Sequence, residues 1–196
     1  NLNKYQKENL EIIPSSKNMV FMGDSITEFW KVNDSIFFSQ NPFINRGISG
    51  QTTSQMAHRF QQDVINLKPS TVVILAGIND IAENSGPISL NEILNNIIKM
   101  VDLANENQIK TILCSVLPAN KFYWNPKIKP ADKVIELNTL IENYALENNI
   151  PYVDYYSAMG DSNKGLQLQH GEDGVHPNLL GYKVMEGILL PYLKIE

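Results

Sequence analysis

The chain has 196 residues, of which 43% are hydrophobic and 19% are charged. This length fits one globular domain over residues 1–196, and the composition excludes collagen-like, coiled-coil and wholly disordered proteins. No apolar run approaches the roughly 18 residues of a membrane span, and a formal net charge of −5 disfavours a nucleic-acid-binding surface. The single cysteine, Cys114, excludes an internal disulfide and a metal cluster of several cysteines.

The amino-terminal end carries no visible targeting signal. The sequence begins with Asn1 instead of Met, so we expect that something upstream has been cleaved or lies outside it. Its first residues show neither the basic region nor the apolar region of a signal peptide. The compartment stays open, and secretion or transport to the periplasm, directed by a signal peptide upstream of this chain, is one alternative.

Short apolar runs along the chain predict β-strands. In chain order they are Met19–Met22, Phe43–Asn45, Thr71–Ala76, Lys110–Leu117 and Tyr152–Asp154. Apolar residues follow one another in these runs instead of alternating with polar ones. This pattern is typical of strands buried on both faces of a parallel sheet.

Helical patterns lie between the predicted strands. Apolar residues recur at spacings of three and four in Thr52–Asn66, Leu90–Asn107, Ala131–Asn148 and Asn178–Leu193. A further helix is expected to begin near Thr27. Alternating strands and helices predict a parallel sheet of about five strands between two layers of helices, a three-layer α/β/α sandwich.

The first candidate functional segment, Gly-Asp-Ser-Ile-Thr at 23–27, follows the first predicted strand. Ligands of such sheets bind beyond the carboxyl ends of the strands, so Ser25 stands where a nucleophile would be exposed. A helix amino terminus at this point also favours negative charge on a nearby oxygen. The alternative is that Asp24 and Ser25 only cap the helix.

A histidine and an aspartate stand close together in Asp-Gly-Val-His-Pro at 173–177. A nucleophilic serine needs an imidazole as base and a carboxylate to orient the imidazole. Asp173 could reach the ring nitrogen of His176 that faces away from Ser25. One alternative is a solvated loop with a helix-capping histidine. Another is a metal site, with nitrogen and oxygen ligands from His170, Glu172, Asp173 and His176.

Candidate donors to a developing oxyanion follow two other strands. Asn79, in Gly-Ile-Asn-Asp at 77–80, carries a side-chain amide that can donate a hydrogen bond. Its alternative reading is a turn, which Asn and Asp favour. Gly50 lies in the loop after the second strand and could present a backbone N–H to the same point.

Taken in order, four blocks resemble the SGNH hydrolase superfamily, also called GDSL-type esterases and lipases. They are Gly-Asp-Ser-Ile-Thr at 23–27, Gly-Ile-Ser-Gly-Gln-Thr-Thr at 47–53, Gly-Ile-Asn-Asp at 77–80 and Asp-Gly-Val-His-Pro at 173–177. The blocks span nearly the whole chain, and Ile26 stands where the GDSL motif has leucine. The resemblance implies a flavodoxin-like α/β/α fold and ester hydrolysis through an acyl-enzyme, with no cofactor and no metal.

The resemblance also implies a role for each residue of the blocks. Ser25 would be the nucleophile and would donate its own backbone N–H to the oxyanion. Gly50 would donate a backbone N–H, and Asn79 would donate its side-chain amide. His176 would act as general base and then general acid, oriented by Asp173. Within the superfamily the chain looks most similar to acetylhydrolases, such as platelet-activating-factor acetylhydrolase subunits and bacterial carbohydrate acetylesterases.

Substrate contacts are expected from residues around these blocks. Asp24, Arg46 and Gln51 stand beside the nucleophile or the oxyanion glycine and are candidates for contacts to substrate. The long stretch Pro118–Pro130 carries Trp124, which could stack on a sugar ring.

We therefore expect a serine esterase that removes acetyl or another short acyl group from a carbohydrate or similar polar substrate. One alternative is a lysophospholipase or thioesterase with a preference for longer acyl chains. A different class is a non-catalytic domain that binds an anion or a carbohydrate. We expect no nucleic-acid partner, and the oligomeric state stays open.

Overall fold

The structure is a computed structural model that describes residues 2–193, so Asn1 and residues 194–196 of the expected domain lie outside the described part. Its centre is a five-stranded, fully parallel sheet in the order β2-β1-β3-β4-β5. The strands are β1 (Met19–Gly23), β2 (Phe43–Gly47), β3 (Thr71–Leu75), β4 (Lys110–Cys114) and β5 (Tyr152–Val153). This order is that of the flavodoxin-like fold, as predicted.

The apolar sequences of the strands match their burial. Every residue of β1 and β3, two adjacent interior strands of the sheet, is buried. The prediction for β4 was too long, because the strand ends at Cys114 instead of Leu117. Past that point the side chain of Asn138 pairs with Val116, accepting from its N–H at 2.7 Å and donating to its carbonyl at 2.9 Å. The side-chain amide thus takes the place of a neighbouring strand.

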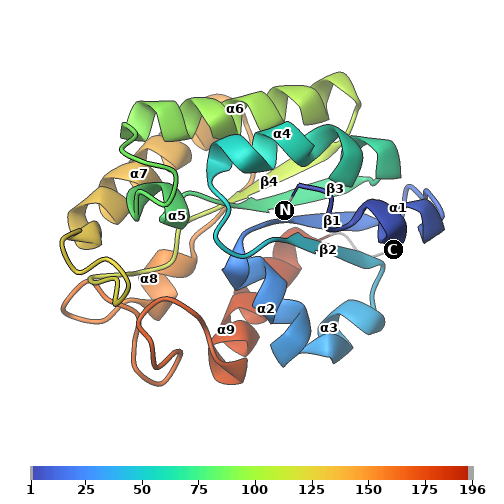
Figure 1. The fold of residues 1–196 in the computed structure, drawn as a ribbon. Coiled ribbons are helices and arrows are strands. Elements are labelled where there is room, and N and C mark those ends of the chain that lie inside the picture. Colours follow the sequence, from blue (N-terminus) through green and yellow to red (C-terminus); the bar gives the residue numbers. More distant parts are fainter. Residues whose placement is uncertain (1, 194–196) are drawn as a thin grey trace.

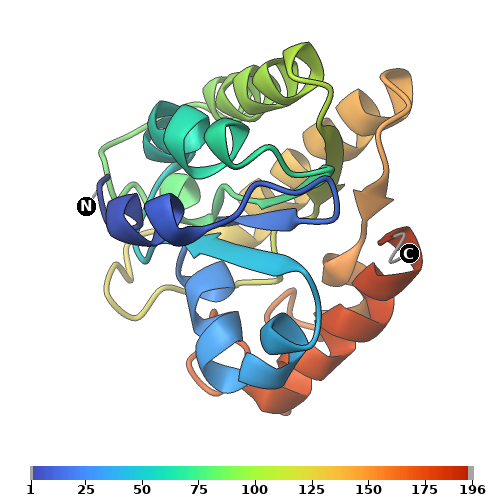
Figure 2. The same cartoon turned by 90° about the vertical axis from the view of Figure 1, so that its right-hand side faces the viewer.

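Helices cover both faces of the sheet (Figure 1). On one face lie α4 (Thr53–Asp63), α6 (Leu90–Glu106), α7 (Pro130–Glu147) and the short α5 (Ile78–Ile81). On the other lie α2 (Ser25–Asn33), α3 (Ser35–Ser39), α8 (Tyr155–Met159) and α9 (Leu179–Leu189). The predicted three-layer sandwich is therefore confirmed. The amino-terminal helix α1 (Gln6–Glu11) packs against α4 beside the β2 edge of the sheet (Figure 2).

The first helix after β1 begins earlier than predicted, at Ser25 instead of Thr27. The side chain of Asp24 caps it by accepting a hydrogen bond of 2.9 Å from the N–H of Ile26. Such a cap satisfies a backbone donor that the first turn of a helix leaves without a partner. Among the helices within residues 2–193, none has the length and apolar character needed to cross a membrane.

The topology fixes where side chains from distant parts of the sequence can meet. The strand order changes direction between β1 and β3, since β2 lies on one side of β1 while β3, β4 and β5 follow on the other. Ligands of open α/β sheets bind at such a switch point, beyond the carboxyl ends of the strands. Ser25 follows β1 and Asn79 follows β3, so both stand at this point.

Candidate active site

Ser25 is held at the end of a tight turn from β1 into α2. The turn requires glycine at position 23, because a Cβ there would lie 2.0 Å from Oγ1 of Thr27 and 2.9 Å from the carbonyl oxygen of Leu75. Ser25 is the first residue of α2, so its backbone N–H has no partner within the helix. Ser25 thus supplies both the candidate nucleophile, its Oγ, and a backbone N–H that no group of the helix accepts.

A chain of hydrogen bonds joins Ser25 to the predicted histidine and aspartate. Oγ of Ser25 lies 2.9 Å from Nε2 of His176, although 151 positions separate the two residues in the sequence. On the other side of the ring, Nδ1 of His176 lies 2.6 Å from Oδ2 of Asp173. Oδ1 of Asp173 accepts from the backbone N–H groups of Val175 at 2.9 Å and His176 at 2.7 Å. The Asp–His segment is therefore a tight, internally bonded turn.

The ionised form of Asp173 is favoured in this turn. Burial alone would raise the pKa of this carboxyl, but the hydrogen bonds from the backbone and ring of His176 and from the N–H of Val175 outweigh burial. The net effect is a lowered pKa. An ionised Asp173 favours the tautomer of His176 with its proton on Nδ1, and this leaves Nε2 free to accept the proton of Ser25. The ring of Phe29 packs beside the imidazole of His176, with 5.2 Å between the two ring centroids.

The side-chain amide of Asn79 has a fixed orientation. Its Nδ2 donates to the carbonyl oxygen of Gln51 at 3.1 Å, and its Oδ1 accepts from Nδ2 of Asn84 at 2.8 Å. An amide nitrogen carries two hydrogens, so Asn79 keeps a second donor beyond the one given to Gln51. Asn84 is a positioning residue that the sequence did not single out, since nothing in its local pattern sets it apart from an ordinary turn asparagine.

Gly50 lies in the exposed part of the loop between β2 and α4. Its φ of +77° is in the left-handed region, while a Cβ at this position would meet no atom within 4 Å. The backbone conformation and not a lack of space therefore favours glycine here. The residues on either side of Gly50 are held by hydrogen bonds. The main-chain carbonyl of Gln51 accepts from the Asn79 amide, and the N–H and hydroxyl of Ser49 donate to the carboxylate of Glu28.

The substrate contacts expected of Asp24, Arg46 and Gln51 are not supported by their positions, because these side chains are only 1%, 0% and 4% exposed. Asp24 caps α2, and burial raises its pKa to about 7. The guanidinium of Arg46 points to the amino-terminal segment, where it packs on the ring of Tyr5. Oε1 of Gln51 accepts from Arg59 at 2.6 Å. All three side chains are engaged inside the protein.

Trp124, by contrast, is placed where a ligand can reach it. Its side chain is 51% exposed, and its ring stacks on buried Phe122 with centroids 4.9 Å apart. Tyr123 is exposed as well. The loop after β4 therefore presents aromatic rings to solvent.

The candidate metal ligands do not gather around one point. Within residues 2–193 no three His, Cys, Asp or Glu side chains are grouped so that they could hold a metal ion. His170 is buried, and its carbonyl accepts from the N–H of Asn178 at 2.8 Å. The segment instead serves to bring His176 and Asp173 to Ser25.

A parallel sheet with a Ser–His–Asp chain at its carboxyl edge defines an α/β/α protein of hydrolase type. Residues 21–184 match the GDSL-like Lipase/Acylhydrolase family, and the chain belongs to this family. The resemblance seen in the four sequence blocks is thus confirmed. Membership identifies the protein as a hydrolase that acts on esters.

Three known proteins are similar to this chain. The fold matches that of a GDSL-like lipase from Bacteroides thetaiotaomicron with a TM-score of 0.96 and 46% identity, covering 98% of this chain and 96% of the other. The acetylxylan esterase of Geobacillus stearothermophilus is 26% identical over 78% of this chain and 72% of that protein. The uncharacterized lipoprotein YqeF of Bacillus subtilis is 35% identical over 38% of this chain, but the match spans only 32% of YqeF.

Proposed function

We propose that this protein is a serine esterase that hydrolyses short-chain acyl esters, acetyl esters above all, through a covalent acyl-enzyme. The observation that carries the proposal is the 2.9 Å contact between Oγ of Ser25 and Nε2 of His176, with Asp173 on the opposite ring nitrogen at 2.6 Å. Both distances lie within the range in which a general base can take a proton from a nucleophile.

In the first half of the reaction, Oγ of Ser25 attacks the carbonyl carbon of the ester while Nε2 of His176 takes the serine proton. The carbonyl oxygen becomes an oxyanion, which receives the backbone N–H groups of Ser25 and Gly50 and the free amide hydrogen of Asn79. The tetrahedral intermediate then collapses. Its C–O bond to the leaving alcohol breaks, and His176 gives the proton to that alcohol.

In the second half, water attacks the acyl-enzyme while His176 takes a proton from it. The same three donors hold the second oxyanion. The bond between the acyl carbon and Oγ breaks, His176 returns the proton to Ser25, and the carboxylic acid leaves. Asp173 stays ionised throughout and stabilises the imidazolium that forms in each half.

Two observations support the preference for a short acyl group on a polar substrate. The exposed ring of Trp124 offers a surface on which a sugar can stack. A relative named acetylxylan esterase agrees with a carbohydrate acetyl ester as substrate.

The test is the turnover of 4-nitrophenyl esters of increasing chain length by the wild type, Ser25→Ala and Ser54→Ala. Ser54 is an exposed residue of α4 and serves as the matched control. We expect the highest kcat/KM for the acetyl ester, a loss of several orders of magnitude in Ser25→Ala, and wild-type rates in Ser54→Ala. A maximum at long chains would favour a lysophospholipase or thioesterase, and full activity of Ser25→Ala would overturn the mechanism.

A further inference from the structure

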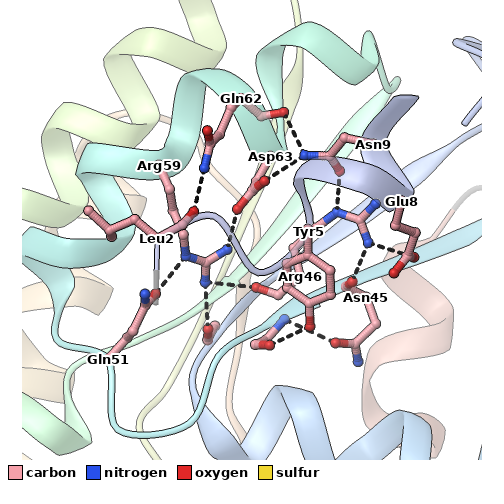
Figure 3. Close-up of polar contacts among 12 residues, drawn as sticks. Leu2, Tyr5, Glu8, Asn9, Asn45, Arg46, Gln51, Arg59, Gln62 and Asp63 are labelled. Atoms are coloured by element: carbon pink, nitrogen blue, oxygen red, sulfur yellow. Dashed lines mark hydrogen bonds and ion pairs between the residues drawn. The ribbon is translucent and has the colours of Figure 1, made fainter. Parts of the chain in front are cut away.

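A buried arginine, Arg59, lies among Gln51, Asp63 and the end of β2, and the mechanism does not use it (Figure 3). Arg59 belongs to α4, and its side chain has no exposed surface. Its guanidinium donates four hydrogen bonds, which end on Oε1 of Gln51 at 2.6 Å, Oδ2 of Asp63 at 3.0 Å, the carbonyl of Gly23 at 3.0 Å and the carbonyl of Arg46 at 2.8 Å. Every bond lies within the ordinary range or is shorter.

Two of these bonds tie together the carboxyl ends of neighbouring strands. Gly23 is the last residue of β1 and stands two positions before Ser25. Arg46 is the last but one residue of β2, at the start of the loop that leads to Gly50. One nitrogen of Arg59, Nη2, donates to both carbonyls. The arginine therefore fixes the distance between the turn that carries Ser25 and the loop that carries Gly50.

A third hydrogen bond of Arg59 connects it to Asn79 through Gln51. The side chain of Gln51 is held by Nε of Arg59, while the main-chain carbonyl of Gln51 accepts the hydrogen bond from the Asn79 amide. Gln51 also follows Gly50 directly in the chain. The guanidinium of Arg59 is thus connected to all three donors assigned to the oxyanion. It reaches Ser25 and Gly50 through short stretches of main chain and Asn79 through Gln51.

We infer that Arg59 is a positioning residue that sets the relative placement of the oxyanion donors of Ser25, Gly50 and Asn79. The inference rests on the proposed esterase function, because the donors have a task only if an oxyanion forms. Donors that are fixed in advance cost no reorganisation during the reaction, and misplacement by about 1 Å can lower the rate on the order of 100-fold.

Arginine suits this task better than any other residue. Its planar guanidinium presents five donors in fixed directions, whereas the ammonium of lysine is a compact group on a flexible stem. Asp63, which is fully buried as well, balances the charge. Its Oδ1 accepts from Nδ2 of Asn9 at 2.7 Å, so the ion pair has a further bond to the amino-terminal segment (Figure 3).

Asn138 offers a control that distinguishes a positioning role of Arg59 from a purely structural one. Asn138 of α7 is also buried, and it also holds the backbone just beyond a strand, here Val116 after β4. None of the oxyanion donors follows β4. Loss of the Asn138 side chain should therefore lower stability without changing the placement of the donors, and Asn138→Ala is the matched control for Arg59.

The experiment compares the wild type, Arg59→Lys and Asn138→Ala on 4-nitrophenyl acetate below their melting temperatures. Arg59→Lys should lower kcat about 10- to 100-fold with KM changed less than about threefold. Its inhibition constant for phenylboronic acid, which forms a tetrahedral adduct with the serine, should rise by a similar factor. Asn138→Ala should lower Tm by about 4–10 °C and leave kcat and the inhibition constant near the wild-type values.

Gln51→Met provides a second variant if Arg59→Lys fails to fold. It removes only the contact to Nε of Arg59 and should lower kcat while KM stays close to that of the wild type. A change confined to KM would mean that Gln51 touches substrate and would overturn the inference. A folded Arg59→Lys variant whose kcat equals that of Asn138→Ala would also overturn the inference. Failure of the proposed function looks different, because the wild type itself would then be inactive or Ser25→Ala would remain active.

Discussion

The aspartate beside the nucleophile should make the stability of this protein depend on pH. Asp24 is 1% exposed, and burial raises its pKa from 3.8 to about 7, with a smaller contribution in the same direction from Asp80. The N–H of Ile26 and the nearby His176 act in the opposite direction without overcoming burial. Replacing Asp24 by Asn keeps an oxygen that can accept from Ile26 and removes the ionisable group.

The direction and size of the effect follow from linkage between protonation and folding. Between pH 3.8 and 7 the unfolded chain has lost the Asp24 proton while the folded chain retains it, so folding becomes less favourable as the pH rises through this window. The difference between 3.8 and about 7 is about three pKa units, which corresponds to a penalty of ~4 kcal/mol above pH 7. Asp24→Asn does not carry this penalty.

Urea unfolding of the wild type and Asp24→Asn from pH 4 to pH 9 measures the effect. Near pH 4 the two free energies of unfolding should be similar. As the pH rises the variant should become the more stable protein by a few kcal/mol, and the difference should level off above pH 7. A constant difference over the whole range would show that Asp24 does not titrate as its burial implies, and a variant less stable at pH 8 would refute the reasoning.

Three further variants test the site. Trp124→Ala should raise KM about three- to tenfold for an acetylated oligosaccharide while sparing 4-nitrophenyl acetate, whereas equal losses on both would rule out a sugar contact. Asp173→Asn should lower kcat on the order of 10³- to 10⁴-fold, because the preferred tautomer of His176 is lost; a near wild-type kcat would contradict this role. Gly50→Ala should cost about 1–2 kcal/mol of stability, since its φ is positive, and should reduce kcat. A fully active, equally stable variant would show that the loop conformation is unimportant.

The central strands and long helices were predictable because their signals are local. Thr71–Leu75 is apolar throughout, and the helix at Leu90–Glu106 begins at the capping box of Ser89 and Glu92. The short helices Ser35–Ser39 and Ile78–Ile81 escaped prediction because too few turns exist to show a periodic pattern. The residues of the Ser–His–Asp chain were also predicted, since their blocks stand at the ends of predicted elements.

The positions of Arg46 and Gln51 could not be predicted, because their burial depends on contacts between distant segments. Arg46 stands next to a glycine at the end of a strand, a place where a charged side chain is normally in solvent. It is covered here by the amino-terminal segment, where Tyr5 packs on the guanidinium and Glu8 and Asn9 accept its hydrogen bonds. Helix α1 itself has no buried residue, so its sequence carries no sign of this docking.

The acyl-enzyme itself can be trapped and located. The protein is mixed with excess acetyl ester, quenched in acid during turnover, and examined by mass spectrometry before and after proteolysis. The mechanism requires an added mass of one acetyl group, carried by the peptide that contains Ser25, and no added mass in Ser25→Ala. An acetyl group on a different residue, or steady turnover by Ser25→Ala, would contradict the assignment of Ser25 as the nucleophile.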